Sequence, residues 1–181
     1  MLVKKTLFAL LAIIAVAVSA LTARVVAASA ATPACGGGCI SVFSRELGTS
    51  STPNFVEAIL GGRAQVGAHV GLKRASASDP SEDILPRAGS VATFYAAGIV
   101  SAAVNEHYGP LLAVQQEYAP FGVRTGLCVG LKRRAYQTEG LTLQSCSAGA
   151  TTVWIVDPDL SRSTPGYFPI CLLYTSPSPR D

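Results

Sequence analysis

Four short segments in the second half of the chain carry the residue pattern of β-strands. They are "LLAVQQEYAP" at 111–120, "TGLCVGL" at 125–131, "GLTLQSC" at 140–146 and "TTVWIVD" at 151–157. The fourth segment is rich in β-branched and aromatic residues, Leu141 and Leu143 of the third fall on one face of a strand, and turns that contain glycine join the segments. Four short strands in so short a stretch predict an all-β sandwich, barrel or trefoil.

The stretch that precedes these segments is less regular. "FVEAIL" at 55–60 has the pattern of a strand, and "AQVGAHVGLKRAS" at 64–76 has that of one or two strands. The following "SASDPSEDILPRAGS" at 76–90 contains two prolines and many polar residues, which favours a loop. The apolar run that follows fits either a strand and a helical turn or one helix, and we expect a strand at 91–96.

The N-terminus has the three parts of a secretory signal. Two lysines precede an apolar run over 6–21, and the small residues at 28–30 form a cleavage site, with a weaker one at 18–20. A membrane-spanning anchor is the alternative, but the run of about 16 residues is shorter than the roughly 20 that a span needs. We therefore expect a signal peptide over 1–30 and a secreted, extracellular protein with no membrane contact after cleavage.

The charge of the chain lies mostly in this leader. The chain carries 14 basic and 11 acidic residues, but three of the basic residues belong to the leader, and the last two residues, Arg180 and Asp181, cancel each other. The body between them is neutral. Its composition therefore gives no reason to expect a nucleic-acid partner.

Residues 31–54 are expected to form an N-terminal arm. Three glycines separate Cys35 from Cys39, and glycine allows the chain to reverse tightly there. A disulfide is the simpler interpretation in an exported protein. Half of a metal site is the alternative, but no second Cys or His pair has ligand spacing, so no metal is predicted.

The last eleven residues, 171–181, differ in character from the body. They contain the fifth cysteine, Cys171, and a Ser-Pro repeat. Back-translation of this segment gives a DNA sequence that looks like a transposase adapter used in sequencing libraries. We therefore expect this tail to be translated adapter and the native protein to continue past Ile170 with other residues. The alternative is a disordered tail rich in Ser and Pro.

One segment of the body, 126–157, resembles a single repeat of the ricin-type β-trefoil lectins. The matching pieces are Gly-Leu-Cys-Val at 126–129, a polar loop at 132–139, "GLTLQSC" at 140–146 and Thr-Val-Trp at 152–154. The resemblance implies an all-β, β-trefoil-like domain over 55–170. That domain would be incomplete because the chain is truncated near residue 170.

The same resemblance implies roles for three residues of the repeat. Cys128 and Cys146 would form a disulfide between neighbouring strands, and closing that loop would stabilise the fold by about 3 kcal/mol. Trp154 is the only tryptophan. It is expected to anchor the core and to need a partner for its indole N–H, with a sugar-stacking platform as the alternative.

A trefoil needs three such units, and an earlier copy is a candidate at 55–97. In one register Ala64 and Ala75 replace the two cysteines, and 89–98 matches the segment around Trp154. A conflicting register places "VGLKRA" at 70–75 on "VGLKRRA" at 129–135 of the clear repeat. The sequence does not choose between them.

Sugar sites of ricin-type repeats use an Asp shortly after the first Cys, an aromatic platform and a nearby Asn or Gln. Here Gly130 stands in place of that Asp, and Thr152 in place of the Gln of Gln-x-Trp. The site is therefore degenerate. The remaining candidates for a shallow polar site are Tyr136, Gln137, Glu139 and Gln144.

No motif for catalysis is present. The two histidines, His69 and His107, belong to no nucleophile elbow and no metal-binding signature, and no phosphate-binding loop occurs. We expect an exported, non-catalytic binding domain without a cofactor, for which carbohydrate is the candidate partner. The alternative is a secreted structural or protein-interaction domain that keeps the scaffold without binding sugar.

Overall fold

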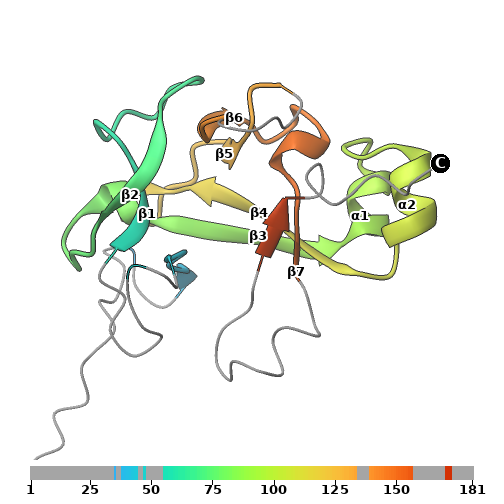
Figure 1. The fold of residues 1–181 in the computed structure, drawn as a ribbon, viewed down its shortest axis with the longest axis horizontal. Helices are drawn as coiled ribbons and strands as arrows, with labels where there is room; N and C mark the ends of the chain where they lie inside the picture. The colour runs from blue at the N-terminus through green and yellow to red at the C-terminus, as the bar shows by residue number, and fades with distance from the viewer. Residues whose placement is uncertain are drawn as a thin grey trace, which may run out of the picture.

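The computed structural model describes residues 35, 38–44, 47, 55–133, 139–156 and 170–172. The predicted leader, most of the predicted tail and part of the N-terminal arm lie outside these residues. The described part consists mainly of strands, which confirms the all-β class (Figure 1). No helix in these ranges is long and apolar enough to cross a membrane.

The strands are short, and most of them are joined by single turns of 3-10 helix or by loops. In chain order the elements are β1 (Phe55–Ile59), β2 (Val70–Arg74), the turn η2 (Pro80–Glu82), β3 (Ile84–Ser90), α1 (Val91–Ala96), α2 (Ala102–Tyr108), β4 (Leu112–Tyr118), η3 (Pro120–Gly122), β5 (Leu127–Gly130), β6 (Thr142–Ser145), η4 (Ala150–Thr152), β7 (Trp154–Val156) and β8 (Ile170–Leu172). All four strands predicted over 111–157 are present, and so is the strand predicted at 55–60.

The strand predicted at 91–96 is wrong, because these residues form α1. Ser90 and Thr93 make a capping box. The Ser90 hydroxyl accepts the Thr93 N–H at 3.1 Å, and the Thr93 hydroxyl accepts the Ser90 N–H at 3.4 Å. Val91 and Phe94, which are buried, have the spacing of one helix face. The caps decide this segment, since its β-branched and aromatic content also suits a strand.

The loop predicted over 76–90 is wrong in its second half. Residues 84–90 form β3, which pairs antiparallel with β4 along its whole length, from Ile84 opposite Tyr118 to Ser90 opposite Leu112. Proline cannot donate a backbone hydrogen bond, so it suits the edge of a sheet. Among the described residues, the edge of β3 away from β4 has only an isolated bridge at Ile84, and Pro86 is tolerated there. The partner strand, rather than the local composition, therefore determines the extended structure.

The strands of the second half pair in a compact pattern. β4 pairs with β7, where Val114 lies opposite Trp154, and three residues later with β5, where Glu117 lies opposite Cys128. β5 and β6 form a hairpin, and η4 leads from β6 into β7. We call these four strands, β4 to β7, the second unit.

The first half repeats this pattern with a short arm segment in place of β4. Ile40 bridges to Ile84 on β3, and three residues later Phe43 bridges to Val56 on β1. β1 and β2 form the hairpin, and η2 leads from β2 into β3. We call residues 40–43 with β1, β2 and β3 the first unit.

The shared pairings define which residues of the two units are equivalent. Ile84 takes the place of Trp154, and Val56 takes the place of Cys128. Lys73 lies opposite Val56 as Gln144 lies opposite Cys128, which makes β2 the counterpart of β6. The register that matched 70–75 to the end of β5 is therefore wrong.

The other register is right only in part. It placed Ala75 on the second cysteine, two residues after Lys73, and the hairpin pairings agree with that placement. Ala64, which it placed on the first cysteine, lies in the loop between β1 and β2. The segment 89–98, which it placed on β7, forms the end of β3 and α1.

The core lies between the two units. Buried apolar side chains from both of them meet there: Ile59, Ala68, Val70, Ile84, Val114, Tyr118, Val129, Leu131, Leu143, Trp154 and Val156. The indole N–H of Trp154 donates to the Val129 carbonyl at 3.2 Å. Each large apolar side chain buried in this way stabilises the fold by about 1.5–3 kcal/mol.

A smaller cluster attaches the two helices to the sheet. Val91, Phe94 and Val100 pack with Ala113 of β4 and Ile155 of β7. The helices therefore lie at one end of the molecule, and the β1–β2 hairpin lies at the other (Figure 1).

Both disulfides of the body are formed. Cys128 and Cys146 join β5 to β6 with their Cα atoms 4.9 Å apart, and Cys35 and Cys39 close the glycine loop with Cα atoms 6.1 Å apart. Cys171 lies in β8, opposite Ile155 of β7. β8 thus pairs with β7 as β4 pairs with β3.

Candidate binding site

The predicted sugar-site residues are only partly within the described chain. Tyr136 and Gln137 lie outside it. Glu139 is half-buried at the start of the segment that leads into β6. Gln144 lies on β6, where its side-chain amide donates to the Thr142 hydroxyl at 2.8 Å. This contact lies within one strand, so it assembles no site.

The position expected to carry the sugar-binding Asp has no room for any side chain. A Cβ atom on Gly130 would lie 2.4 Å from the Thr151 carbonyl oxygen. The same oxygen accepts the Leu131 N–H at 3.1 Å, so the end of β5 is pressed against η4. The missing Asp in the second unit therefore has a steric cause.

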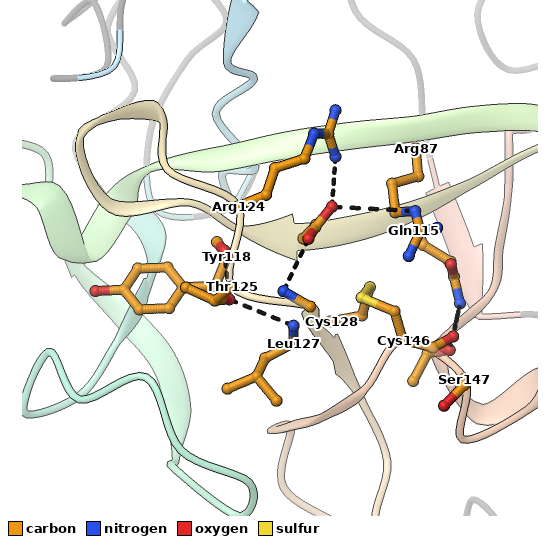
Figure 2. A network of polar contacts seen from close by, with 12 residues as sticks. Arg87, Gln115, Tyr118, Arg124, Thr125, Leu127, Cys128, Cys146 and Ser147 are labelled. Atoms are coloured by element: carbon orange, nitrogen blue, oxygen red, sulfur yellow. Dashed lines mark hydrogen bonds and ion pairs between the residues drawn. A yellow bond between two sulfur atoms is a disulfide. The ribbon is translucent and has the colours of Figure 1, made fainter.

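Thr152, which stands in place of the Gln, has a structural role. It is fully buried, and its hydroxyl accepts from the Gln115 amide at 2.8 Å and donates to the Gly149 carbonyl at 2.9 Å. The same Gln115 amide donates to the Cys146 carbonyl at 2.6 Å (Figure 2). These contacts attach β4 to the disulfide-bonded hairpin.

A second polar network fixes the loop between β4 and β5. The carboxylate of Glu117 is buried and forms ion pairs with Arg124 and, at 4.0 Å, with Arg87 (Figure 2). Its other oxygen accepts the Gly126 N–H at 2.9 Å. Since both oxygens are engaged inside the protein, this carboxylate holds the loop in place and is not free to bind a ligand.

A depression of about 330 Å³ lies in the first unit, between the β1–β2 hairpin and η2. Backbone and side chains from three segments line it, among them Leu60, Gly61, Gly62, Lys73, Asp79 and Ser81. Leu60 is 49% exposed and supplies an apolar wall. The depression therefore combines apolar surface with charged and hydroxyl groups.

The polar groups of this depression form one connected set. Asp79 caps η2 by accepting the Ser81 N–H at 2.9 Å, and its second carboxylate oxygen pairs with the Lys73 ammonium. Ser81 is only 5% exposed, and its hydroxyl has no hydrogen-bond partner. A buried hydroxyl without a partner costs free energy, which a bound polar group would recover.

Two further carboxylates hold η2 in position. Both oxygens of Glu82 accept the Ser76 N–H at 3.1 Å, and burial raises the pKa of this carboxyl. Asp83 is fully buried and accepts the Phe121 N–H at 2.8 Å and the Cys35 N–H at 3.2 Å. The wall of the depression is therefore fixed by the surrounding fold.

The depression lies beside η2, the turn of the first unit that corresponds to η4 of the second. Ser81 lies three residues before Ile84, as Thr151 lies three residues before Trp154. In the second unit the end of β5 hydrogen-bonds to η4 and closes the gap. In the first unit the chain turns away at Gly61 and Gly62, which have φ of +83° and +64°.

Sequence reasoning missed these residues, although one signal was present. Asp79 followed by Pro80 is a helix-start signature, since Asp caps the first turn and Pro suits its first position. That signature predicts η2. It does not predict that Lys73 approaches η2, because this contact depends on how β2 is placed.

Of the histidines considered for catalysis, His107 lies apart from the depression, whereas the carbonyl of His69 accepts the N–H of Leu60, a lining residue, at 2.8 Å. His69 bridges to Thr142 of β6, and His107 is exposed on α2, where its ring contacts Tyr108 edge-on. Within the described ranges no three His, Cys, Asp or Glu side chains group as metal ligands would. No protein-family model, curated protein or solved structure matches the chain.

Proposed function

We propose that the protein is an exported, non-catalytic binding domain of β-trefoil-like architecture, and that it binds carbohydrate at the depression beside η2. The observation that carries the proposal is the depression itself, where a buried, unpartnered hydroxyl lies beside a neutral ion pair and an apolar wall. The N-terminal signal pattern supports export.

The repeated pairing of strands supports the architecture. A β-trefoil consists of three units of four strands, and the first and second units have the same pairings in the same order. β8 pairs with β7 as β4 pairs with β3, so β8 stands where the first strand of a third unit would begin.

The chemistry of the depression suits a neutral, polyhydroxylated ligand. Lys73 has donors beyond the one used by Asp79, the Asp79 carboxylate has further lone pairs, and the Ser81 hydroxyl can donate and accept. Leu60 can cover the apolar C–H face of a sugar ring. The ion pair leaves the site without net charge, so it does not select for a charged ligand.

A glycan array probed with the full-length protein tests this proposal, followed by titration of the best neutral glycan. Replacing Lys73→Ala and, separately, Ser81→Ala should weaken binding about tenfold or more, because each removes a hydrogen bond from the site. His107→Ala changes an exposed residue at the opposite end of the molecule and should leave the affinity unchanged.

Two other outcomes would contradict the proposal. If Gln144→Ala abolishes binding while Lys73→Ala does not, sugar binds at the second unit as the sequence predicts. An array without any signal favours the alternative function, a secreted structural or protein-interaction domain on the same scaffold.

A further inference from the structure

We infer that the ligand is an oligosaccharide, of which one sugar unit fills the depression and a neighbouring unit stacks on the exposed ring of Phe121. This inference rests on the proposed function and extends its site. Phe121 lies on η3 and is 71% exposed, more than any other large apolar side chain in the described ranges. An aromatic ring in this state offers a face on which the C–H face of a sugar can stack.

The backbone of Phe121 is held in an unfavourable conformation. Its φ of 55° and ψ of 27° lie in the left-handed region, which a bulky residue seldom adopts. Phe121 is the only residue other than glycine with positive φ in the part of the chain that the structure describes. Backbone strain of this kind persists where the surroundings enforce it, and it concentrates at functional sites.

Buried carboxylates enforce this conformation from both ends of the loop. The Phe121 N–H donates to the fully buried carboxylate of Asp83. At the other end Glu117 binds Arg124 and the Gly126 N–H. The ring is thus exposed on a fixed loop, which lowers the entropy that a ligand must remove on binding.

The same contacts place the loop that carries Phe121 close to the depression. Asp83 follows η2 directly, and η2, which carries Ser81, packs against η3. The hydroxyl of Tyr118, three residues before Phe121, donates to the Gly62 carbonyl at 3.3 Å. The loop of Phe121 is therefore attached to two of the segments that line the depression.

Adjacent side chains extend this apolar platform. Val123 is 66% exposed, and the side chain of Arg124 is 51% exposed beside it. Two exposed apolar side chains are too small a surface for a stable protein–protein interface, which needs about 800 Å² on each partner. A second sugar unit covers a surface of this size, which is why we prefer a longer glycan over a protein partner.

The test compares one sugar with its oligomer. The hexose with the strongest array signal and its linear tetrasaccharide are titrated by calorimetry against the full-length protein, which should bind the tetrasaccharide about tenfold more tightly. Phe121→Ala should remove this advantage and leave the affinity for the hexose unchanged. Phe121→Trp should keep the advantage, since it retains a ring.

Tyr95→Ala is the matched control, because Tyr95 is an aromatic residue 43% exposed on α1, at the other end of the molecule. It should leave both affinities unchanged. Equal affinities of the wild-type protein for hexose and tetrasaccharide, or a Phe121→Ala variant with full affinity for the tetrasaccharide, would overturn the inference and leave the proposed function intact. Absence of binding to any sugar would instead refute both.

A thermal melt tests whether the Phe121 ring has a structural role instead. Phe121→Ala should have the Tm of the wild-type protein within about 2 °C, because an exposed side chain contributes little to stability. A larger drop would show that the ring is packed within the native protein, and it would overturn the inference.

Discussion

The two units have the same strand pairings but achieve stability with different residues. The second unit has a disulfide between β5 and β6 and a tryptophan at the start of β7. The first unit has Val56 and Ala75 at the cysteine positions and Ile84 at the tryptophan position. The pairing pattern therefore does not depend on the residues by which such a repeat is recognised in a sequence.

The described residues of the two units also differ beside the 3-10 turn, η2 in the first unit and η4 in the second. In the second unit Gly130 packs directly against the Thr151 carbonyl and closes the gap between β5 and η4. In the first unit the corresponding place is the depression beside Ser81. In the described residues, the gap between β5 and η4 is therefore filled, and the candidate site lies in the first unit, which lacks the cysteines and the tryptophan of the repeat.

The largest expected effect tests whether Ile84 and Trp154 are equivalent core positions. Trp154→Ala should destabilise the protein by about 3–5 kcal/mol and Ile84→Ala by about 2–5 kcal/mol, because each opens a cavity in the shared core. Urea unfolding followed by circular dichroism measures both. Leu112→Ala, at a half-exposed position of β4, should change the stability by less than about 0.5 kcal/mol. A similarly small change for Ile84→Ala would contradict the equivalence of the two units.

The strands and helices differ in how well the sequence predicts them. The strands over 111–157 are predicted correctly, because turns that contain glycine or proline separate short apolar segments there. β3 was missed because "ILPRAGS" has a proline, a glycine and little alternation, and becomes a strand only by pairing with β4. α1 was missed because hydroxyl caps at Ser90 and Thr93 outweigh the strand-like composition of the segment.

The candidate site was harder to predict than the fold. Its residues come from the β1–β2 loop, β2 and the η2 turn, which approach one another only after both hairpins have formed. The resemblance to a known repeat predicts a site in the second unit instead. Only the Asp79–Pro80 pair marked a local structure at the site in advance.

The disulfide of the second unit gives the next largest effect. Replacing both Cys128 and Cys146 with Ala should cost about 3 kcal/mol in the chain-entropy model, because it frees a long loop in the unfolded chain. The Cys35–Cys39 disulfide closes a shorter loop. Replacing both of these cysteines with Ser should therefore cost less, about 2 kcal/mol. Guanidinium unfolding of both double variants compares the two values. A smaller loss for the Cys128 and Cys146 variant than for the other would mean that the hairpin pairing already restrains the unfolded second unit.

The stability of the protein should also fall with rising pH, because the carboxyl group of Glu57 in the first unit is buried. Burial raises the pKa of Glu57 from 4.5 to about 8, whereas the equivalent position in the second unit is Val129. The folded state therefore keeps a proton that the unfolded chain releases above pH 4.5. The contribution of the protonated carboxyl is fully present below pH 4.5 and is lost between about 4.5 and 8, by at most about 1.4 kcal/mol per pH unit.

Glu57→Val, which copies the second unit, should remove this pH dependence, and Glu57→Gln should remove it without changing the size of the side chain. Chemical denaturation at a series of pH values between 4 and 9 measures the effect. An unchanged slope in both variants would show that Glu57 ionises normally in the folded protein.

The smallest expected effect on stability comes from Lys73, whose equivalent in the second unit is Gln144. Lys73→Ala removes an ion pair whose lysine side chain is 45% exposed, and ion pairs near the surface contribute about 0–1 kcal/mol. The same substitution should abolish most of the affinity for sugar, whereas Gln144→Ala at the equivalent place should affect neither property by much. A melt and a titration of the two variants give this contrast directly. If Lys73→Ala lowers stability by several kcal/mol, the pair with Asp79 supports the η2 turn; if the folded variant keeps its full affinity for sugar, the depression has no role in binding.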